Sequence, residues 1–269
     1  MPRLTREQIE RAIDVMGSRL DLDRRDLQGL DLSGLNLEGA ILVGSNLFKA
    51  DLSGANLRGA NLNAANLSSV NLRQADLSRG HLFEAHLLKA DLRDADLREA
   101  DLSRAELIGV DLEGAHLEGT NLKRADLNMA NLKRANLWRA RLEKTTLSAA
   151  SLEGADLDAA NLRGANLVGA DLGDAKLRGA DLNTADLSEA RLVGADLSGA
   201  SLKGAILSGA DLSGANLSEA DLEEADLVGA NLASASVQNV RYWRTRYDER
   251  TQWPDGFDHA FANGLIREE

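Results

Sequence analysis

Acidic residues and histidines are the side chains of this chain that could act in catalysis or bind a metal ion. The chain has 43 Asp and Glu residues and 4 His residues, but no Cys. Carboxylates and imidazoles serve as general acids and bases or hold metal ions, whereas the absence of thiols removes thiol catalysis, disulfides and thiolate metal sites. Most carboxylates recur at one fixed spacing, so pairs at acid–base distance arise from repetition alone. We therefore predict no catalytic residues, no cofactor and no enzyme activity.

The four histidines are the remaining candidates for a metal site. His81 and His86 are five residues apart, His116 falls on a different predicted face, and His259 lies in the terminal segment. Each of the first three occupies a place that usually holds Asp or Asn in this sequence. We read them as substitutions at that place and predict no metal site.

Leucine stands at every fifth position from Leu22 to Leu232, which gives 43 consecutive pentapeptides without a slip. Five residues advance an α-helix by about 500°, so the leucines would scatter around a helix axis. In a flat strand they would alternate between the two faces. The chain must therefore turn a corner once per pentapeptide.

Two positions of each pentapeptide point inward. Alanine precedes the leucine by two residues in 33 of the 43 repeats, and Asp or Asn stands between them in 31. A short extended segment directs alanine and leucine to one side and the polar residue to the other, and the last two residues make the turn. Replacing a central leucine such as Leu132 by alanine should cost about 2–5 kcal/mol. Arg25 occupies an alanine position, so we expect a distorted first coil or an imperfect register there.

The repeats Ala-Asp-Leu-Ser-Gly and Ala-Asn-Leu-Arg-Gly closely resemble those of the pentapeptide-repeat family. The resemblance implies an all-β fold, a right-handed parallel quadrilateral β-helix in which four pentapeptides make one coil. The predicted organisation is an N-terminal capping helix at 1–19, the repeat solenoid at 20–234 and a C-terminal cap or tail at 235–269.

The sequences of both terminal segments are typical of caps that cover the open ends of a β-helix. Residues 5–8, Thr-Arg-Glu-Gln, form a capping box, and one apolar stripe follows before Gly17: Ile9, Ala12, Ile13 and Met16. The last thirty residues hold six of the nine aromatics: Tyr242, Trp243, Tyr247, Trp253, Phe257 and Phe261. Residues 247–258 look like the tail that often finishes pentapeptide-repeat proteins. An alternative reading is that these aromatics bind a partner.

No apolar run is long enough to cross a membrane, and residues 1–3 lead into an amphipathic helix rather than a signal peptide. We therefore expect a cytoplasmic protein that does not enter a membrane.

One predicted surface column is free of charge. With twenty residues per coil, the position after the leucine stacks as Gln28, Phe48, Ser68, Leu88, Ile108, Asn128, Ser148, Val168, Ser188, Ser208 and Val228. The equivalent columns of the other faces carry charges at 17 of 32 positions. We call the exposed apolar residues of this face the candidate strip: Phe48, Leu88, Ile108, Met129, Val168, Ile206 and Val228. Isolated apolar residues on a surface are ordinary, which is the competing interpretation.

A second local anomaly is cationic. We call it the candidate basic girdle: Lys123, Arg124, Lys133, Arg134, Trp138, Arg139, Arg141 and Lys144. Between residues 121 and 145 these cations meet only Asp126 and Glu143, and Trp138 is placed to stack with a guanidinium or a ligand. A solvated charge belt and an anion site both fit the pattern.

Two functional classes follow. The first is a non-catalytic scaffold that presents its faces to an unknown protein partner, with a homodimer as one arrangement. The second comes from the resemblance, because some pentapeptide-repeat proteins are acidic mimics of DNA that bind gyrase or related topoisomerases. The net charge of −12 fits the second class, but 31 interspersed basic residues argue against a continuous acidic track and direct nucleic-acid binding is not expected.

Overall fold

The structure is a computed structural model that describes residues 4–16, 20–258 and 264–268. These described residues form one helix, α1 (Arg6–Met16), and two short strands, β1 (Arg246–Tyr247) and β2 (Ile266–Arg267). Two compact units divide the chain, the first over residues 1–136 and the second over residues 137–269. Within the described residues, no helix has the length and apolar character that crossing a membrane requires.

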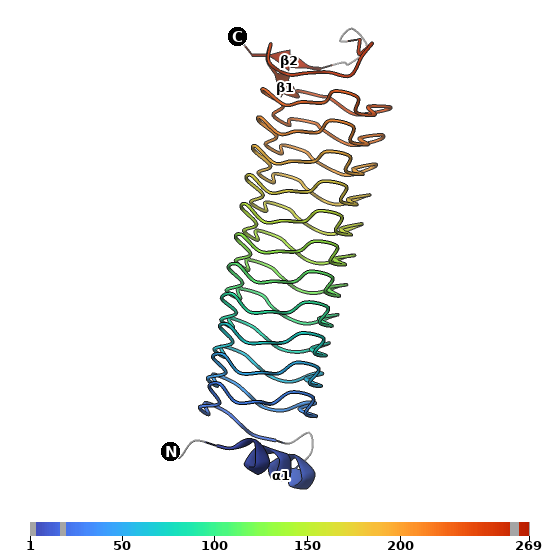
Figure 1. Cartoon of the computed structure of the whole chain (residues 1–269). Helices are drawn as coiled ribbons and strands as arrows, with labels where there is room; N and C mark the ends of the chain where they lie inside the picture. The colour runs from blue at the N-terminus through green and yellow to red at the C-terminus, as the bar shows by residue number, and fades with distance from the viewer. Residues whose placement is uncertain (1–3, 17–19, 259–263, 269) are drawn as a thin grey trace. The chain divides into compact units, whose positions relative to one another are not determined.

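Each unit is a parallel β-helix built from the predicted pentapeptides (Figure 1). Single-residue parallel bridges join positions twenty residues apart, as in Asp31 with Asp51 in unit 1 and Asn161 with Asp181 in unit 2. Twenty residues are four pentapeptides, so each turn of the backbone contains four leucines. The leucine positions are buried from Leu22 to Leu232 and the alanine positions from Ala40 to Ala235, whereas the earlier alanine-column residues Arg25, Leu30 and Leu35 are only half-buried. The inward assignment of both positions is confirmed.

The corner of each pentapeptide is a tight turn. The amide of the alanine donates to the carbonyl of the preceding leucine, as from Ala50 to Leu47 at 2.9 Å. The second turn residue has a positive φ, which glycine adopts freely and other residues adopt under strain. Among the residues that the structure describes, twenty-six other than glycine nevertheless take this conformation, for example Ala159 at 55°. The tightness of the winding therefore outweighs the local preference.

The first coil of unit 1 is regular, and the expectation of a distorted coil at Arg25 was wrong. Asp21 and Asp26 pair with Ile41 and Asn46 in the same twenty-residue register as later coils. The side chain of Arg25 is half-exposed rather than forced into the axis. Because α1 rather than another coil lies at this end, the long side chain has room to leave the core.

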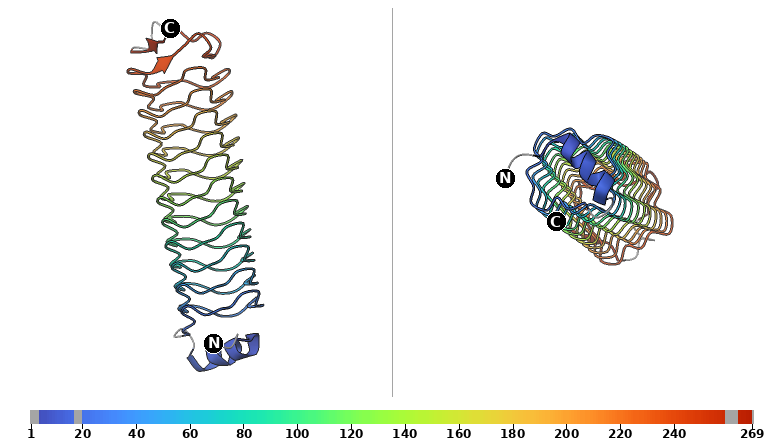
Figure 2. Two further views of the ribbon diagram at one scale, coloured as in Figure 1. Left: turned by 90° about the vertical axis from the view of Figure 1, so that its left-hand side faces the viewer. Right: turned by 90° about the horizontal axis from the view of Figure 1, so that it is seen from below.

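Helix α1 lies across the end of unit 1, as the end-on view of Figure 2 shows. The predicted capping box is confirmed, since the Thr5 amide donates to the Gln8 side chain at 2.9 Å and the Gln8 amide donates to the Thr5 hydroxyl at 3.3 Å. Ile9 is 1% exposed, and Ala12 and Ile13 are half-buried. Arg6 bonds the carboxylate of Asp31 at 2.8 Å. Gly17 lies outside the described residues.

Unit 2 ends in a modified coil. Asn231 pairs with Gln252, a separation of 21 rather than 20 residues, so one side near the end has an extra residue. The Asp248 carboxylate compensates, because it accepts the Gly229 amide at 2.9 Å where a backbone carbonyl serves in other coils. Strands β1 and β2 then pair in parallel, with Arg246 opposite Ile266.

Candidate functional site

The fold leaves three residues of each pentapeptide at the surface, namely the residue before the leucine and the two turn residues after it. The residues at these three positions therefore determine the chemical character of each unit's surface. Stacking at a constant register turns them into columns that run from coil to coil.

In unit 1 the structure stacks the candidate strip in successive coils. The backbone ladder runs through Phe48, Ser68, Leu88, Ile108 and Asn128, each of whose carbonyls accepts an amide from the coil before it at 2.9–3.1 Å. Leu88 is 42% exposed and Met129 is 64% exposed, while Phe48 and Ile108 are half-buried. The ammonium of Lys49 lies 5.1 Å from the centre of the Phe48 ring, so the edge of this face is not free of charge.

Unit 2 has an uncharged column of its own at the same position of the pentapeptide. Val168, Ser188, Ser208 and Val228 accept ladder hydrogen bonds at 2.9 Å from the preceding coils. Val168 and Val228 are half-buried and Ile206 is 40% exposed. Ile206 stands between Asp186 and Asp226 in its own column, so it is an apolar residue flanked by acids. The part of the strip in unit 2 is therefore more interrupted than the part in unit 1.

The candidate basic girdle falls in both units. Unit 1 holds its first four cations, with Arg124 and Arg134 exposed and Lys123 and Lys133 half-buried. Arg134 pairs with Glu113 one coil earlier, and its hydrogen bond is the main reason that the pKa of that carboxyl is lowered.

Unit 2 holds the other four girdle residues. The Arg139 guanidinium lies over the Trp138 ring at 4.3 Å, which confirms that this indole stacks with a guanidinium. Arg141 and Lys144 are exposed.

The histidines are not brought together. The Nδ1 atom of His86 lies 2.8 Å from Glu106, that of His116 lies 3.8 Å from Glu118, and His81 is exposed. His259 lies outside the described residues. Across the described ranges, no group of three or more His, Asp or Glu side chains is arranged to hold a metal ion.

Four of the terminal aromatics converge in unit 2. Trp253 stacks on Phe257 with ring centres 4.2 Å apart, and both meet Tyr242 edge-on at 6.0 and 5.8 Å. Tyr247 also meets Trp253, at 5.7 Å. Trp243 is 60% exposed, so it is not part of this cluster, and Phe261 lies outside the described residues.

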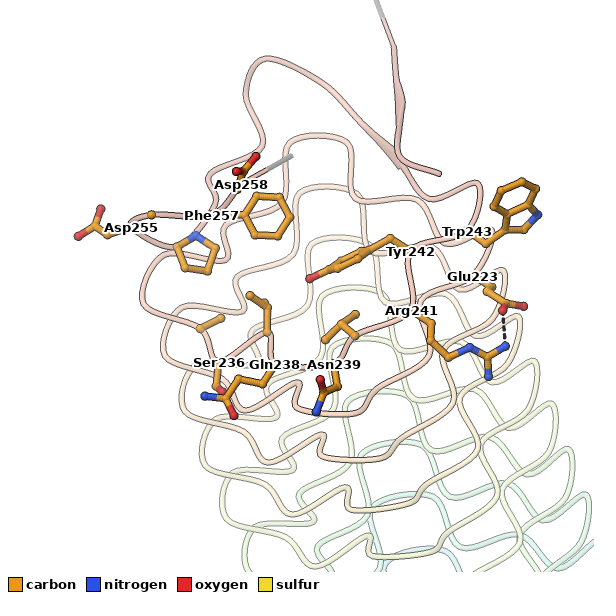
Figure 3. A pocket seen from close by; sticks show the side chains of 15 residues that line it. Glu223, Ser236, Gln238, Asn239, Arg241, Tyr242, Trp243, Asp255, Phe257 and Asp258 are labelled. Atoms are coloured by element: carbon orange, nitrogen blue, oxygen red, sulfur yellow. Dashed lines mark hydrogen bonds and ion pairs between the residues drawn. The ribbon is translucent and has the colours of Figure 1, made fainter. Parts of the chain in front are cut away.

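A hollow of about 780 Å³ lies beside this cluster, and sequence reasoning missed it (Figure 3). It is bounded by Glu223, by residues 235–243 of the last two regular sides and by residues 254–258. The only available signal was the decay of the repeat at Val237 and Tyr242, where the leucine position changes type.

The sequence of both units matches a known family. The family model described as pentapeptide repeats matches residues 26–63, 45–82, 60–99, 81–114, 100–139, 125–164, 140–179, 165–204 and 205–241. The chain belongs to the pentapeptide-repeat family. Its right-handed β-helix is the fold of that family.

Among solved structures, this pentapeptide-repeat protein is similar to HetL, a pentapeptide-repeat protein involved in heterocyst differentiation regulation from the cyanobacterium Nostoc sp. strain PCC 7120. The two are 40% identical over 86% of this chain and 97% of HetL, with a TM-score of 0.68. A second Nostoc pentapeptide-repeat protein is 40% identical over 40% of this chain and 84% of its own, with a TM-score of 0.26.

QnrB1, a plasmid-mediated fluoroquinolone resistance protein, is 18% identical over 73% of this chain and 89% of its own, with a TM-score of 0.38. No curated protein matches the sequence.

Proposed function

We propose that this pentapeptide-repeat protein is a non-catalytic scaffold that binds a protein partner through the candidate strip. The observation that carries the proposal is the uncharged column that passes through Phe48, Ser68, Leu88 and Ile108 in successive coils of unit 1. A surface of this kind loses little hydration of charge when it is covered, and its apolar atoms gain from burial. The involvement of HetL in the regulation of heterocyst differentiation is consistent with binding rather than catalysis.

We further propose the architecture that serves this role. The twenty-residue register supports a quadrilateral coil with one pentapeptide on each side. The burial of Ile9 supports α1 as a cap, and the ring contacts of Tyr242, Trp253 and Phe257 support an aromatic cap in the C-terminal segment. The organisation into 1–19, 20–234 and 235–269 rests on these observations. A cytoplasmic location stays a prediction.

The test is a variant of the strip, Leu88→Glu combined with Ile108→Lys. Both residues are turn residues on the surface, so the fold should be retained within about 0.5 kcal/mol. We expect the variant to lose capture of the native partner, and to sediment as a monomer if the wild-type chain self-associates through this face.

The matched control is Ser78→Glu combined with Ser103→Lys, which places the same charges at equivalent turn positions of other columns. The control should bind as the wild-type chain does. If the strip variant and the wild-type chain are indistinguishable in sedimentation and in every capture experiment, the strip has no binding role.

The net charge of −12 favours a second candidate function, the acidic DNA mimic that modulates gyrase. Ion pairs between successive coils oppose it, as between Arg191 and Asp171 at 2.8 Å or Lys203 and Asp221 at 3.0 Å. Such pairs break up a continuous acidic face. We expect unchanged gyrase supercoiling activity at micromolar concentrations of the protein, and concentration-dependent inhibition would instead support mimicry.

The candidate basic girdle stays a hypothesis for an anion site. The pairing of Arg134 with Glu113 and the stacking of Arg139 on Trp138 already engage two of its cations.

A further inference from the structure

One side of the last regular coil of unit 2 has an incomplete backbone edge. On this side of the preceding coils of unit 2, each pentapeptide bonds the next coil through the carbonyl of its alanine, the amide of its leucine and the amide of its second turn residue. Ala215, Leu217 and Glu219 do this with Ser236 and Gln238 at 2.8–2.9 Å. The corresponding groups one coil further are the Ala235 carbonyl and the amides of Val237 and Asn239. Within the described ranges, none of these three groups has a hydrogen bond.

The flanking edge of the same coil is bonded on both sides of this gap. Leu232 donates to Gln252 at 2.6 Å, and further along Arg244 donates to Gly264 at 2.7 Å before β1 pairs with β2. The chain thus adds a further hydrogen-bonded layer over the segments that precede and follow residues 235–239, but not over residues 235–239 themselves. The incomplete edge is the length of about one pentapeptide.

The hollow of about 780 Å³ adjoins this edge. Tyr242 is only 7% exposed, its hydroxyl points into the hollow, and that hydroxyl has no hydrogen-bond partner in the described part of the chain (Figure 3). Burial raises the pKa of this phenol, so it remains a neutral donor near pH 7. An unsatisfied buried hydroxyl is costly, and a bound acceptor would remove that cost.

We propose that this edge binds an extended peptide segment of a partner protein, which adds as a parallel strand over Ala235–Asn239. One guest residue lies opposite Ser236, donating its amide to the Ala235 carbonyl and accepting the Val237 amide. The guest carbonyl two residues later accepts the Asn239 amide. This is the ladder of the preceding coils of unit 2 on this side, continued by a second molecule.

The register of the ladder defines which guest side chains fit. The residue before the central guest residue lies over the alanine column and must be small, and the residue after it lies over Val237, where an aliphatic side chain continues the leucine column. The central residue points outward beside Ser236. Guests with the pattern small, polar, leucine are therefore selected.

The charge at the rim defines the central residue further. Among the described residues that line the hollow, Glu223, Asp255 and Asp258 are acidic and Arg241 is basic. Arg241 pairs with Glu223 and with Asp221, and Glu223 also pairs with Lys203. A basic central residue complements this acidic rim. The guest class is thus an extended segment of the type Ala-Lys-Leu or Ala-Arg-Leu.

The test uses the full chain and the synthetic peptide acetyl-Gly-Ala-Lys-Leu-Ser-Gly-amide. We expect saturable shifts and slowed hydrogen exchange of the Val237 and Asn239 amides in NMR spectra. Methylating the amide nitrogen of the peptide lysine removes the bond to Ala235 and should weaken binding about tenfold. Shifts that spread over unrelated coils, or equal affinity of the methylated peptide, would overturn strand addition.

Tyr242→Phe is the informative protein variant, because it removes the hydroxyl and keeps the ring. It should weaken peptide binding about three- to tenfold while its thermal midpoint stays close to that of the wild-type chain. Tyr247→Phe, outside the hollow, is the matched control and should bind normally. The strip variant Leu88→Glu with Ile108→Lys should also bind the peptide normally, so failure of the strip proposal and failure of this one are separable.

Discussion

At the scale of single residues, the second turn position stores the most local strain. Glycine has no side chain to clash at a positive φ, whereas an alanine there costs about 1–2 kcal/mol before the entropy of the unfolded chain is counted. The chain uses both kinds of residue at equivalent places. These places therefore allow a direct measurement of the strain that the coil imposes.

Ala159→Gly should stabilise unit 2 by about 0.5–1 kcal/mol, since Ala159 is exposed and has a φ of 55°. Gly169→Ala should destabilise it by a similar amount, because a methyl group there meets no atom within 4 Å and the cost is conformational only. Urea unfolding of both variants with unchanged m-values measures this. Destabilisation by Ala159→Gly, or stabilisation by Gly169→Ala, would contradict the strain argument.

Residue types alone predicted the inward and outward positions, because leucine is invariant at its position and the alanine and polar positions differ strongly in composition. They did not predict that the Arg25 side chain is half-exposed in a regular coil, since its exposure depends on which segments pack against that coil. The same limit applies to Tyr242 and Trp243, adjacent aromatics of which one is buried and the other exposed. The burial of these two aromatic side chains depends on C-terminal segments that lie outside the repeat pattern.

At the scale of elements, the altered side near the end of unit 2 is held by one carboxylate. Asp248 accepts the amides of Gly229, Arg250 and Thr251 and pairs with the Arg250 guanidinium at 2.7 Å. Burial by itself would raise the pKa of Asp248, but the hydrogen bonds from Arg250, Gly229 and Thr251 outweigh it and lower the pKa to about 2.

This carboxylate gives the end of unit 2 a defined acid sensitivity. Its folded pKa lies below the value of about 3.9 for an unfolded Asp, so its contribution to stability is complete above that value and is lost as the pH falls toward 2. The Gly229 amide resonance should titrate near pH 2 in the wild-type chain. Asp248→Asn should abolish that titration, whereas Asp255→Asn should leave it unchanged; a Gly229 resonance that moves near pH 4 would refute the assignment.

The elements divide into those that the sequence could predict and those that it could not. Helix α1 and its capping box follow from local chemistry, because Thr5 and Gln8 need only each other. The number of pentapeptides in a coil does not follow, since any whole number of them keeps leucine over leucine, and only the family resemblance indicated four. The extra residue before Gln252 left no readable trace, because the repeat has already decayed there.

At the scale of the whole molecule, the interior and the surface obey different rules. Most pentapeptides offer the same inward pair of alanine and leucine, so we expect the interior to tolerate a change in which pentapeptide lies above which. The surface columns depend on the register of twenty. A deletion can therefore change the surface columns without changing the packing of the interior.

Removing residues 61–80 should leave unit 1 folded and keep Phe48 and Leu88 in one column. Removing only residues 61–65 should also leave it folded, but should move Leu88 to a different side of the coil from Phe48. Circular dichroism and urea midpoints should be similar for both deletions, and only the shorter one should lose binding through the strip. Unfolding by the shorter deletion alone would show that the interior does distinguish its pentapeptides.

The constant separation of paired residues also bears on how the chain acquires its structure. Nearly every bridge joins residues twenty apart, so the loop that must close for each new coil is short and always the same length. Folding of such a chain does not depend on contacts between residues far apart in the sequence. It can begin at any coil and extend to the neighbouring coils. A nascent chain of this kind can fold coil by coil as it is synthesised, long before its last residues exist.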